Sequence, residues 1–287
     1  MQRLILGTAV FAPGYGISNL GSILSERQGL ALLEAALSLG IQDFDTAPSY
    51  GNAEKMLGFV KNAGHNFDVS TKISYEACLN PKTIESFITE SLKRLQVSQI
   101  EILYLHDEKS LLEEDASLLL KELENLRKCG LFKKLGVSIY TEASLKFLMQ
   151  KFQQIDVFQV PENICDRRLR ESSISQEMID DHREYIIRSV FLQGLLLMPT
   201  CDIPNYLSET RTTVESLQIF AEKKQMTVLD LCLAYVRDIA WCNGIIVGAS
   251  TCQELTKIVR SQGKLPQNWS KEVKTISEKL IDPRNWN

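Results

Sequence analysis

Short apolar runs alternate with longer amphipathic stretches eight times along the chain, and this alternation restricts the fold more than any other feature. Several runs, such as EILYL (101–105) and GIIV (244–247), are apolar at consecutive positions, as is typical of strands that are covered on both faces. Eight parallel strand–helix units close into a (β/α)8 TIM barrel, and 287 residues suffice for one such domain. We therefore predict an α/β fold, a single barrel domain over residues 1–287.

An open, doubly wound sheet is the alternative fold. It would be expected to carry a glycine-rich phosphate turn after an early strand. The first turn, GTAVFAPGYG, has glycines at positions 7, 14 and 16, which do not fit G-x-G-x-x-G, so the closed barrel is favoured. Strands are predicted at 3–8, 41–46, 67–73, 99–106, 132–140, 155–160, 183–190 and 244–249. Helices are predicted at 25–40, 51–64, 81–96, 116–129, 141–152, 171–182, 211–224, 227–238, 252–262 and 269–281.

Composition excludes several classes of function. The 32 basic and 36 acidic residues give a formal charge of -4 without a basic cluster, which argues against a nucleic-acid partner. Seven cysteines without a C-x-x-C pair and three scattered histidines predict no metal site, and they indicate reduced thiols in a cytoplasmic protein. Arg3 followed by LILGTAVFA resembles a weak signal peptide, but Gly7 interrupts this short run, which serves better as a first strand. No run approaches the ~20 apolar residues of a membrane span.

Polar residues end three consecutive predicted strands. The second strand ends at Asp45 and leads to Tyr50, the third ends at Lys72, and the fourth ends at His106. Each residue alone has an ordinary structural explanation, since an Asp can cap a helix and a Lys at a strand end is usually solvated. Because the C-terminal strand ends of a barrel meet at one mouth, their joint occurrence predicts an active site there.

These four residues together can move a proton. Tyrosine is a poor acid near neutral pH, and the ammonium of Lys72 is expected to favour the phenolate and so lower the pKa of Tyr50. Asp45 would keep Lys72 charged and in place. A neutral imidazole at His106 could donate a hydrogen bond that orients a carbonyl oxygen. We therefore expect general acid–base catalysis by Tyr50.

The stretch DFDTAPSYGNAEKMLG (43–58), with VSTK (69–72) and ILYLH (102–106), resembles the aldo-keto reductases. The resemblance continues through KKLGVSIY, QVPENICDRR and SVFLQGLL to GIIVGASTCQEL, over essentially the whole chain. It implies a (β/α)8 barrel, a nicotinamide cofactor and an oxidoreductase that acts on an aldehyde, a ketone or a sugar-type carbonyl or alcohol. The tetrad of the family falls on Asp45, Tyr50, Lys72 and His106. Tyr50 would protonate the carbonyl oxygen during reduction and take the alcohol proton in reverse.

The resemblance also implies a set of cofactor-binding residues. Ser138 and Gln159 match ligands of the nicotinamide amide, whereas Ile139 replaces an Asn. Arg188 stands where an aromatic ring often stacks on the nicotinamide, and a guanidinium plane can stack there too. Glu254 would repel a 2′-phosphate and could accept hydrogen bonds from a ribose diol, so NADP(H) is expected with NAD(H) as the alternative. The expected cofactor-binding residues are Gly7, Thr8, Ser138, Gln159, Arg188, Ser189, Gly248, Ser250, Thr251 and Glu254, the last four near a helix N-terminus suited to phosphate.

The sequence says less about the substrate than about the cofactor. The loops after the fourth and seventh strands are expected to be brief, leaving an open mouth that suits a bulky or sugar-like molecule. Phe11, Tyr15 and Tyr140 are the expected pocket walls. The opening GTAVFAPGYGISNLGS is similar to a bacterial branch of the family that is linked to surface-polysaccharide sugars. The expected partners are a small carbonyl or sugar substrate and no nucleic acid or membrane, for a monomer or weak homo-oligomer.

Two other functions stay open at this point. One is a cofactor-binding regulatory subunit with slow turnover, like the channel-associated members of the family. The other is a barrel in which Lys72 forms a Schiff base with its substrate. An intact tetrad disfavours the first, and a carboxylate that keeps Lys72 protonated disfavours the second.

Overall fold

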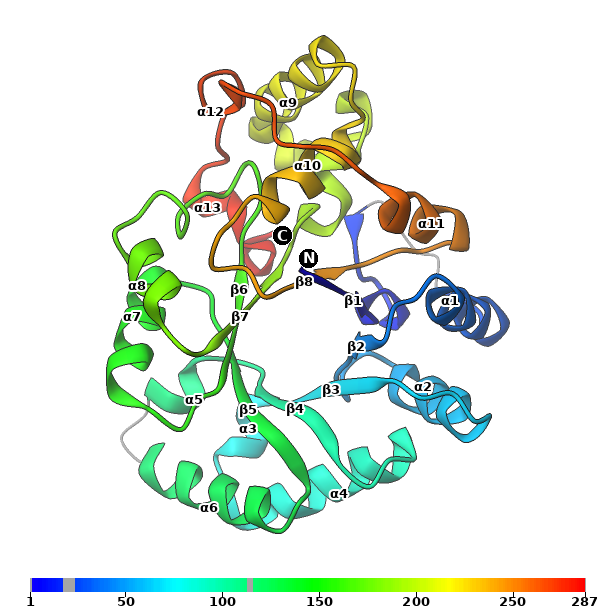
Figure 1. Ribbon diagram of the computed structural model, residues 1–287, viewed down its shortest axis with the longest axis vertical. Helices are drawn as coiled ribbons and strands as arrows, with labels where there is room; N and C mark the ends of the chain where they lie inside the picture. Colours follow the sequence, from blue (N-terminus) through cyan, green and yellow to red (C-terminus); the bar gives the residue numbers. More distant parts are fainter. Residues whose placement is uncertain (1, 18–23, 113–115, 287) are drawn as a thin grey trace.

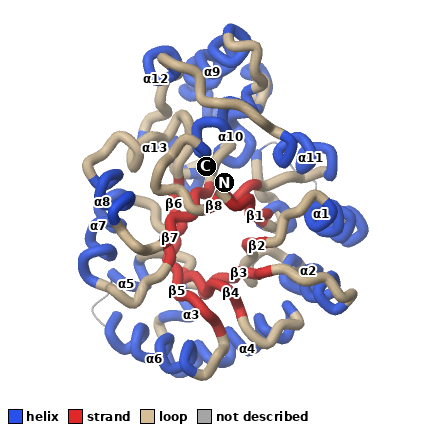
Figure 2. Tube along the Cα trace, in the orientation of Figure 1, coloured by secondary structure: helices blue, strands red, loops and turns tan. Residues whose placement is uncertain are grey.

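The computed structural model describes residues 2–17, 24–112 and 116–286, and their eight parallel strands form a closed barrel. Each strand pairs with the next along the chain, and β8 returns to pair with β1. Figure 2 shows the strands as a central ring surrounded by helices. The strands are β1 (Arg3–Gly7), β2 (Asp43–Asp45), β3 (Asp68–Ile73), β4 (Ile100–Leu105), β5 (Phe132–Ser138), β6 (Val157–Pro161), β7 (Glu184–Arg188) and β8 (Gly244–Val247). The predicted barrel is confirmed, and every strand lies within one residue of its predicted range.

Helices cover the outside of the barrel (Figure 1). Side-chain caps fix several of their starts: Ser25 and Gln28 form a capping box at α1, and Thr141 and Thr227 cap α7 and α10. The longer helices are α1 (Glu26–Ser38), α2 (Ala53–Asn62), α4 (Ile84–Leu95), α6 (Ala116–Lys128), α7 (Glu142–Lys151), α8 (Ile174–Asp180), α9 (Arg211–Lys223), α10 (Val228–Arg237) and α11 (Cys252–Arg260). Two single turns, α3 (Tyr75–Cys78) and α5 (Lys109–Leu112), lie in the loops after β3 and β4. None of the described helices is long and apolar enough to cross a membrane.

The inside of the barrel is packed with side chains. Its apolar cluster consists of Ile5, Ile102, Tyr104, Val157 and Ile186, with Ile246 against it. Gly136 on β5 leaves room for the Tyr104 ring, because a Cβ there would lie 2.3 Å from Tyr104 Cδ1. A second, larger cluster fills the layer between strands and helices. Since the interior is filled, ligands have access only at the mouth of the barrel.

The helix predicted over 269–281 is broken into two single turns, α12 (Trp269–Glu272) and α13 (Glu278–Ile281). Between them the backbone is extended and tied to the loop after β6. Ile276 N–H donates to the Cys165 carbonyl at 2.9 Å, and Arg167 Nη2 donates to the Val273 carbonyl at 2.5 Å. Val273 and Ile276 are also buried. These long-range contacts override the local helical pattern.

The loop after β7 is long, and the prediction of a brief one is wrong. It runs from residue 189 to residue 210 through three 3-10 segments, Leu192–Leu197, Thr200–Asp202 and Asn205–Thr210. Ser189, Leu192 and Gln193 in it have positive φ angles of 62°, 47° and 53°. Such backbone costs roughly 1–3 kcal/mol per residue and concentrates at functional sites. The described part of the loop after β4 holds α5, and residues 113–115 of that loop lie outside the described residues.

Candidate active site

A cavity of about 740 Å3 opens at the C-terminal ends of the strands. Its size is typical of small-molecule and cofactor sites. Most of the residues singled out in the sequence lie in its wall: Gly7, Tyr15, Asp45, Tyr50, Lys72, His106, Ser138, Tyr140, Gln159, Arg188, Ser189, Gly248, Ser250 and Glu254. Residues from β1 to β8 therefore converge on one site. In the described part of the chain, no group of three or more His, Cys, Asp or Glu side chains could hold a metal ion.

A buried ion pair forms the floor of this cavity. Lys72, on β3, donates from Nζ to Asp45 Oδ1 at 2.5 Å and to the Thr46 carbonyl at 2.9 Å. The two charged side chains are only 1% and 6% exposed. The second carboxylate oxygen of Asp45 accepts from Gln159 Nε2 at 2.9 Å. The arrangement fixes Lys72 as expected, but it uses the Gln159 amide that was expected to hold a cofactor.

A tight turn after β2 carries Tyr50 over the ion pair. Gly51 makes this turn with a φ of +59°, and a Cβ there would come within 2.9 Å of the Phe11 carbonyl oxygen. The Tyr50 ring centroid lies 5.0 Å from Lys72 Nζ and 6.1 Å from the His106 ring, which meets it edge-on. All four residues of the predicted tetrad thus surround one point at the mouth.

The pKa of Tyr50 is raised, which contradicts the expected downward shift. Burial is the main cause, the negative charge of Asp45 adds to it, and the positive charge of Arg188 partly opposes it. The ammonium of Lys72 faces the Tyr50 ring, but it is paired with Asp45 at 2.5 Å, so burial has the larger effect on this pKa. Tyr50 is therefore a protonated phenol at neutral pH, which suits a proton donor.

His106 is a neutral imidazole. Burial, reinforced by the charges of Lys72 and Arg188, lowers its pKa to about 3. Because the unfolded chain binds this proton at its ordinary pKa of about 6.5, the resulting stabilisation is complete above about pH 6.5 and is lost as the pH falls toward 3.

We expect one of the three imidazole NMR signals to keep its neutral-form shift down to pH 5, and His106→Gln to remove that signal. The free energy of unfolding should also fall more steeply between pH 6.5 and pH 5 in the wild type than in His106→Gln. A titration midpoint near 6.5 for this signal would contradict the assignment of a buried, neutral ring.

The N-terminus of α11 borders the cavity on its β8 side. Gly248 and Ser250 line the wall, and a Cβ built on Gly248 would meet nothing within 4 Å, so a ligand can approach the backbone there. Thr251 Oγ1 accepts from Glu254 N–H at 3.1 Å, and Glu254 Oε2 accepts from Ser250 N–H at 2.8 Å. The backbone at Gly248 is therefore open to a ligand, whereas the N–H groups of Ser250 and Glu254 already have acceptors within the chain.

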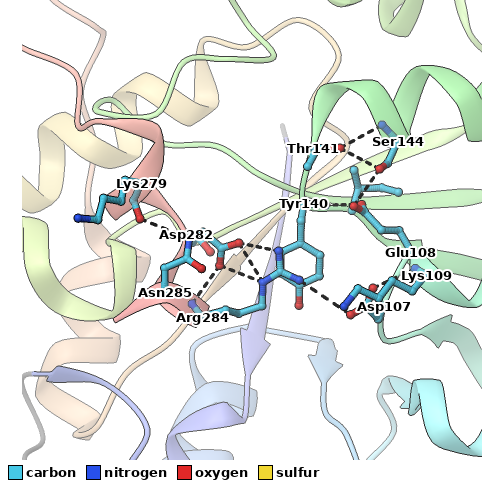
Figure 3. A network of polar contacts seen from close by, with 12 residues as sticks. Asp107, Glu108, Lys109, Tyr140, Thr141, Ser144, Lys279, Asp282, Arg284 and Asn285 are labelled. Carbon is cyan, nitrogen blue, oxygen red and sulfur yellow. Dashed lines mark hydrogen bonds and ion pairs between the residues drawn. The ribbon is translucent and has the colours of Figure 1, made fainter. Parts of the chain in front are cut away.

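The opposite wall holds Tyr140 between two arginine-bearing segments. The guanidinium carbons of Arg188 and Arg284 lie 4.4 Å and 3.3 Å from its ring centroid. Arg284 also pairs with Asp282, its Nη2 lying 2.6 Å from Oδ2, and approaches Asp107 at 3.9 Å (Figure 3). The segment after α13 therefore reaches across to the loops after β4 and β5 and helps to wall the cavity.

Three residues that were expected to contact a ligand lie outside the cavity wall. Thr8 is fully buried, and its N–H and hydroxyl both donate to the Asp45 carbonyl, at 2.9 Å and 3.0 Å. Phe11 is 3% exposed and packs in the core against α1 and α2. Thr251 caps α11 and lies outside the cavity wall. These residues position the site instead of lining it.

Sequence reasoning missed two parts of the wall. The loop after β7 contributes Val190, Phe191, Gln193, Gly194, Leu197, Met198, Pro199 and Asp202, and the C-terminal segment contributes Asp282, Pro283 and Arg284. The polar and turn-forming stretch PTCDIPN (199–205) was a local signal of a long loop. No local pattern indicates the C-terminal segment, since its contacts span more than 100 residues.

Comparison with known proteins agrees with this geometry. The family model for the aldo/keto reductase family matches residues 3–281. A D-threo-aldose 1-dehydrogenase of a Pseudomonas species is 33% identical over 46% of this chain and 50% of its own length, and an L-galactose dehydrogenase of Arabidopsis thaliana is 34% identical over 46% of each. The chain thus spans about half the length of these two curated relatives. An L-glyceraldehyde 3-phosphate reductase of Escherichia coli strain K12 is 22% identical over 92% of this chain and 87% of its own.

Solved structures show the same fold. An aldo-keto reductase from Bacillus halodurans, in its holo form, superposes with a TM-score of 0.76 at 19% identity, covering 97% of this chain and 91% of that one. A glycerol dehydrogenase from Gluconobacter oxydans gives 0.69 at 20% identity, with 99% and 92% covered. The closed barrel and its mouth cavity define a (β/α)8 fold whose ligand cavity lies at the C-terminal ends of the strands. The chain belongs to the aldo/keto reductase family.

Proposed function

We propose that this protein transfers hydride between a nicotinamide cofactor and an aldehyde, ketone or sugar-type carbonyl or alcohol, with Tyr50 as general acid and base. The observation that carries the proposal is the convergence of the Tyr50 phenol, the neutral His106 ring and the buried Lys72–Asp45 pair in one cavity. The aldo/keto reductase family consists of oxidoreductases that use nicotinamide cofactors, which supports the same conclusion.

Four residues of the chain would orient the substrate and transfer the proton. The neutral His106 donates a hydrogen bond to the substrate carbonyl oxygen and orients it beside Tyr50. The Tyr50 phenol then gives its proton to that oxygen, and in the reverse direction it receives the alcohol proton. Lys72, held by Asp45, places a positive charge near Tyr50 that stabilises the phenolate left behind. A bound nicotinamide supplies or accepts the hydride.

The cofactor would lie from Ser138 and Arg188 to the N-terminus of α11. The open backbone at Gly248 would approach its phosphates, and Gly7, Ser189, Ser250 and Glu254 border the same path. NADP(H) is favoured from the family, and NAD(H) is the alternative because the Glu254 carboxylate faces this part of the cavity. Gln159, occupied by Asp45, would contribute mainly by orienting that carboxylate.

The substrate class rests on the relatives. Their names include an aldose dehydrogenase, a galactose dehydrogenase and a glyceraldehyde 3-phosphate reductase, so we infer a sugar or a small aldehyde as substrate. Tyr15 and Tyr140 would border it. The long loop after β7 also borders the cavity, whereas a brief loop and an open mouth had been expected. The part of the GTAVFAPGYGISNLGS stretch from 18 to 22 lies outside the described residues, and the link to surface-polysaccharide sugars stays a prediction, as do a cytoplasmic location and a monomeric or weakly associated state.

A parallel fluorescence titration with NADPH and NADH, followed by a screen of aldehydes and sugars, tests the proposal. We expect binding of at least one cofactor and turnover with a carbonyl or sugar. Glu254→Arg should shift the ratio of dissociation constants toward NADPH by about tenfold, because it replaces a repelling carboxylate with a phosphate ligand. Glu254→Gln, which keeps an acceptor for Ser250 N–H, is the matched control. Binding of neither cofactor by the wild type would refute the proposal; binding without turnover would favour a regulatory subunit.

A further inference from the structure

Arg188 differs from the other cations of the cavity wall. Lys72 is paired with Asp45, and Arg284 is paired with Asp282. Arg188 makes no ion pair with any carboxylate in the residues that the structure describes. The charge of Arg188 helps to lower the pKa of Asp282, but both carboxylate oxygens of Asp282 accept hydrogen bonds from Arg284. Among the described residues of the cavity wall, Arg188 is therefore a cation without an ion-pair partner.

The guanidinium of Arg188 is nevertheless firmly placed. Nη2 donates to the Ile139 carbonyl at 2.9 Å, Nη1 donates to Ser189 Oγ at 3.2 Å, and the group packs against the Tyr140 ring. These two hydrogen bonds use two of the five N–H donors of the group. Nε is buried without a partner, and the terminal nitrogens keep further N–H groups on the side chain that lines the cavity. A partly desolvated cation with unused donors is unfavourable unless an anion completes it.

The charge of Arg188 acts close to the proposed reacting centre. It favours the ionised phenol at Tyr50 and disfavours a protonated ring at His106, so both groups lie within its field. The fixed, planar fork of an arginine matches a carboxylate or a phosphate. The other acidic residues of the wall are Asp202, in the loop after β7, and Glu254, in the first turn of α11.

We propose that Arg188 is a specificity-determining residue that binds a carboxylate or phosphate of the substrate, so that the enzyme prefers acidic carbonyl compounds over their neutral analogues. The inference rests on the proposed function, and it goes beyond it by naming the charge of the substrate. Anion binding at Arg188 is compatible with a stacked nicotinamide ring, because stacking would use the plane of the guanidinium and anion binding its N–H edge.

Matched substrate pairs test this proposal. Succinic semialdehyde is compared with butanal, and glyceraldehyde 3-phosphate with glyceraldehyde, in the wild type, Arg188→Met, Arg188→Lys and Arg284→Met. The wild type should prefer the anionic member of at least one pair, and the pair that shows the preference identifies carboxylate or phosphate. Arg188→Met should reduce the ratio of the two kcat/KM values about tenfold to a hundredfold. Arg188→Lys should retain part of the preference, and Arg284→Met, which removes a paired charge from the same ring, should retain most of it.

A binding measurement separates this inference from the proposed function. Calorimetric titration of succinate and of inorganic phosphate into the protein without added nicotinamide should detect binding that Arg188→Met loses. Arg188-dependent anion binding without carbonyl turnover would support the anion site and refute the proposed function. Equal rates for both members of each pair in the wild type would overturn the inference. So would an Arg188→Met variant that binds NADPH more weakly and slows both members equally, because Arg188 would then serve the cofactor alone.

Discussion

Replacement of Tyr50 by Phe is expected to lower kcat by about a hundredfold to ten-thousandfold, which is the usual contribution of a general acid. The variant loses one oxygen atom and keeps the ring that meets His106 edge-on and faces the Lys72 ammonium. The turn at Gly51 and the Lys72–Asp45 pair do not involve that hydroxyl. Affinity for the cofactor should therefore stay within a few-fold of the wild type.

The pH dependence provides a second measurement on the same residue. Because burial and Asp45 raise the pKa of Tyr50, reduction should run at a constant rate through neutral pH, with the phenol protonated. Oxidation of an alcohol needs the phenolate, so its kcat should rise with pH above neutrality and lose this rise in Tyr50→Phe. Steady-state kinetics in both directions, with fluorescence titration of the cofactor, would check both expectations. A Tyr50→Phe variant with wild-type turnover would show that another group supplies the proton.

The barrel and the placement of Asp45, Lys72 and His106 at its mouth were predictable because both depend on short-range patterns. Consecutive apolar residues indicate strands that are buried on both faces, and the ends of parallel strands share one edge whatever the details of packing. The positions of Asp45, Lys72 and His106 followed from that rule alone. The residue after each strand is harder to place, since a small change in backbone direction decides between the mouth and the helix layer. Thr8 turned toward Asp45, and Ile139 turned into the core.

The rest of the wall depends on contacts between distant segments. Arg284 reaches Tyr140, which lies more than 140 residues earlier, only because the backbone before it is tied to the loop after β6. The wrong helix over 269–281 and the missed C-terminal wall have this single cause. The direction of the pKa shift at Tyr50 also could not be derived without the geometry of the site. A charged lysine nearby predicts a lower pKa, but the 2.5 Å contact of that lysine with Asp45 leaves burial as the larger effect.

Replacement of Lys72 by Met is expected to lower both activity and stability. The Asp45 carboxylate would keep the Gln159 hydrogen bond but lose its cation in a place where the side chain is 6% exposed. Breaking a buried ion pair in this way usually destabilises a protein by about 3–5 kcal/mol, because an uncompensated charge remains. Removing the charge that favours the Tyr50 phenolate should also slow turnover in both directions.

The double variant Asp45→Asn, Lys72→Met separates the two effects. With both charges removed, most of the stability should return, since neutral groups can occupy a buried site at little cost, while activity should stay low. Lys133→Met is the matched control, because Lys133 also lies 2.5 Å from a carboxylate, that of Glu101, but is 52% exposed. Its loss should change the free energy of unfolding by less than about 1 kcal/mol. Denaturant unfolding of the wild type and the three variants measures this series. A Lys72→Met variant as stable as Lys133→Met would mean that the buried Asp45 carboxylate does not need the positive charge of Lys72.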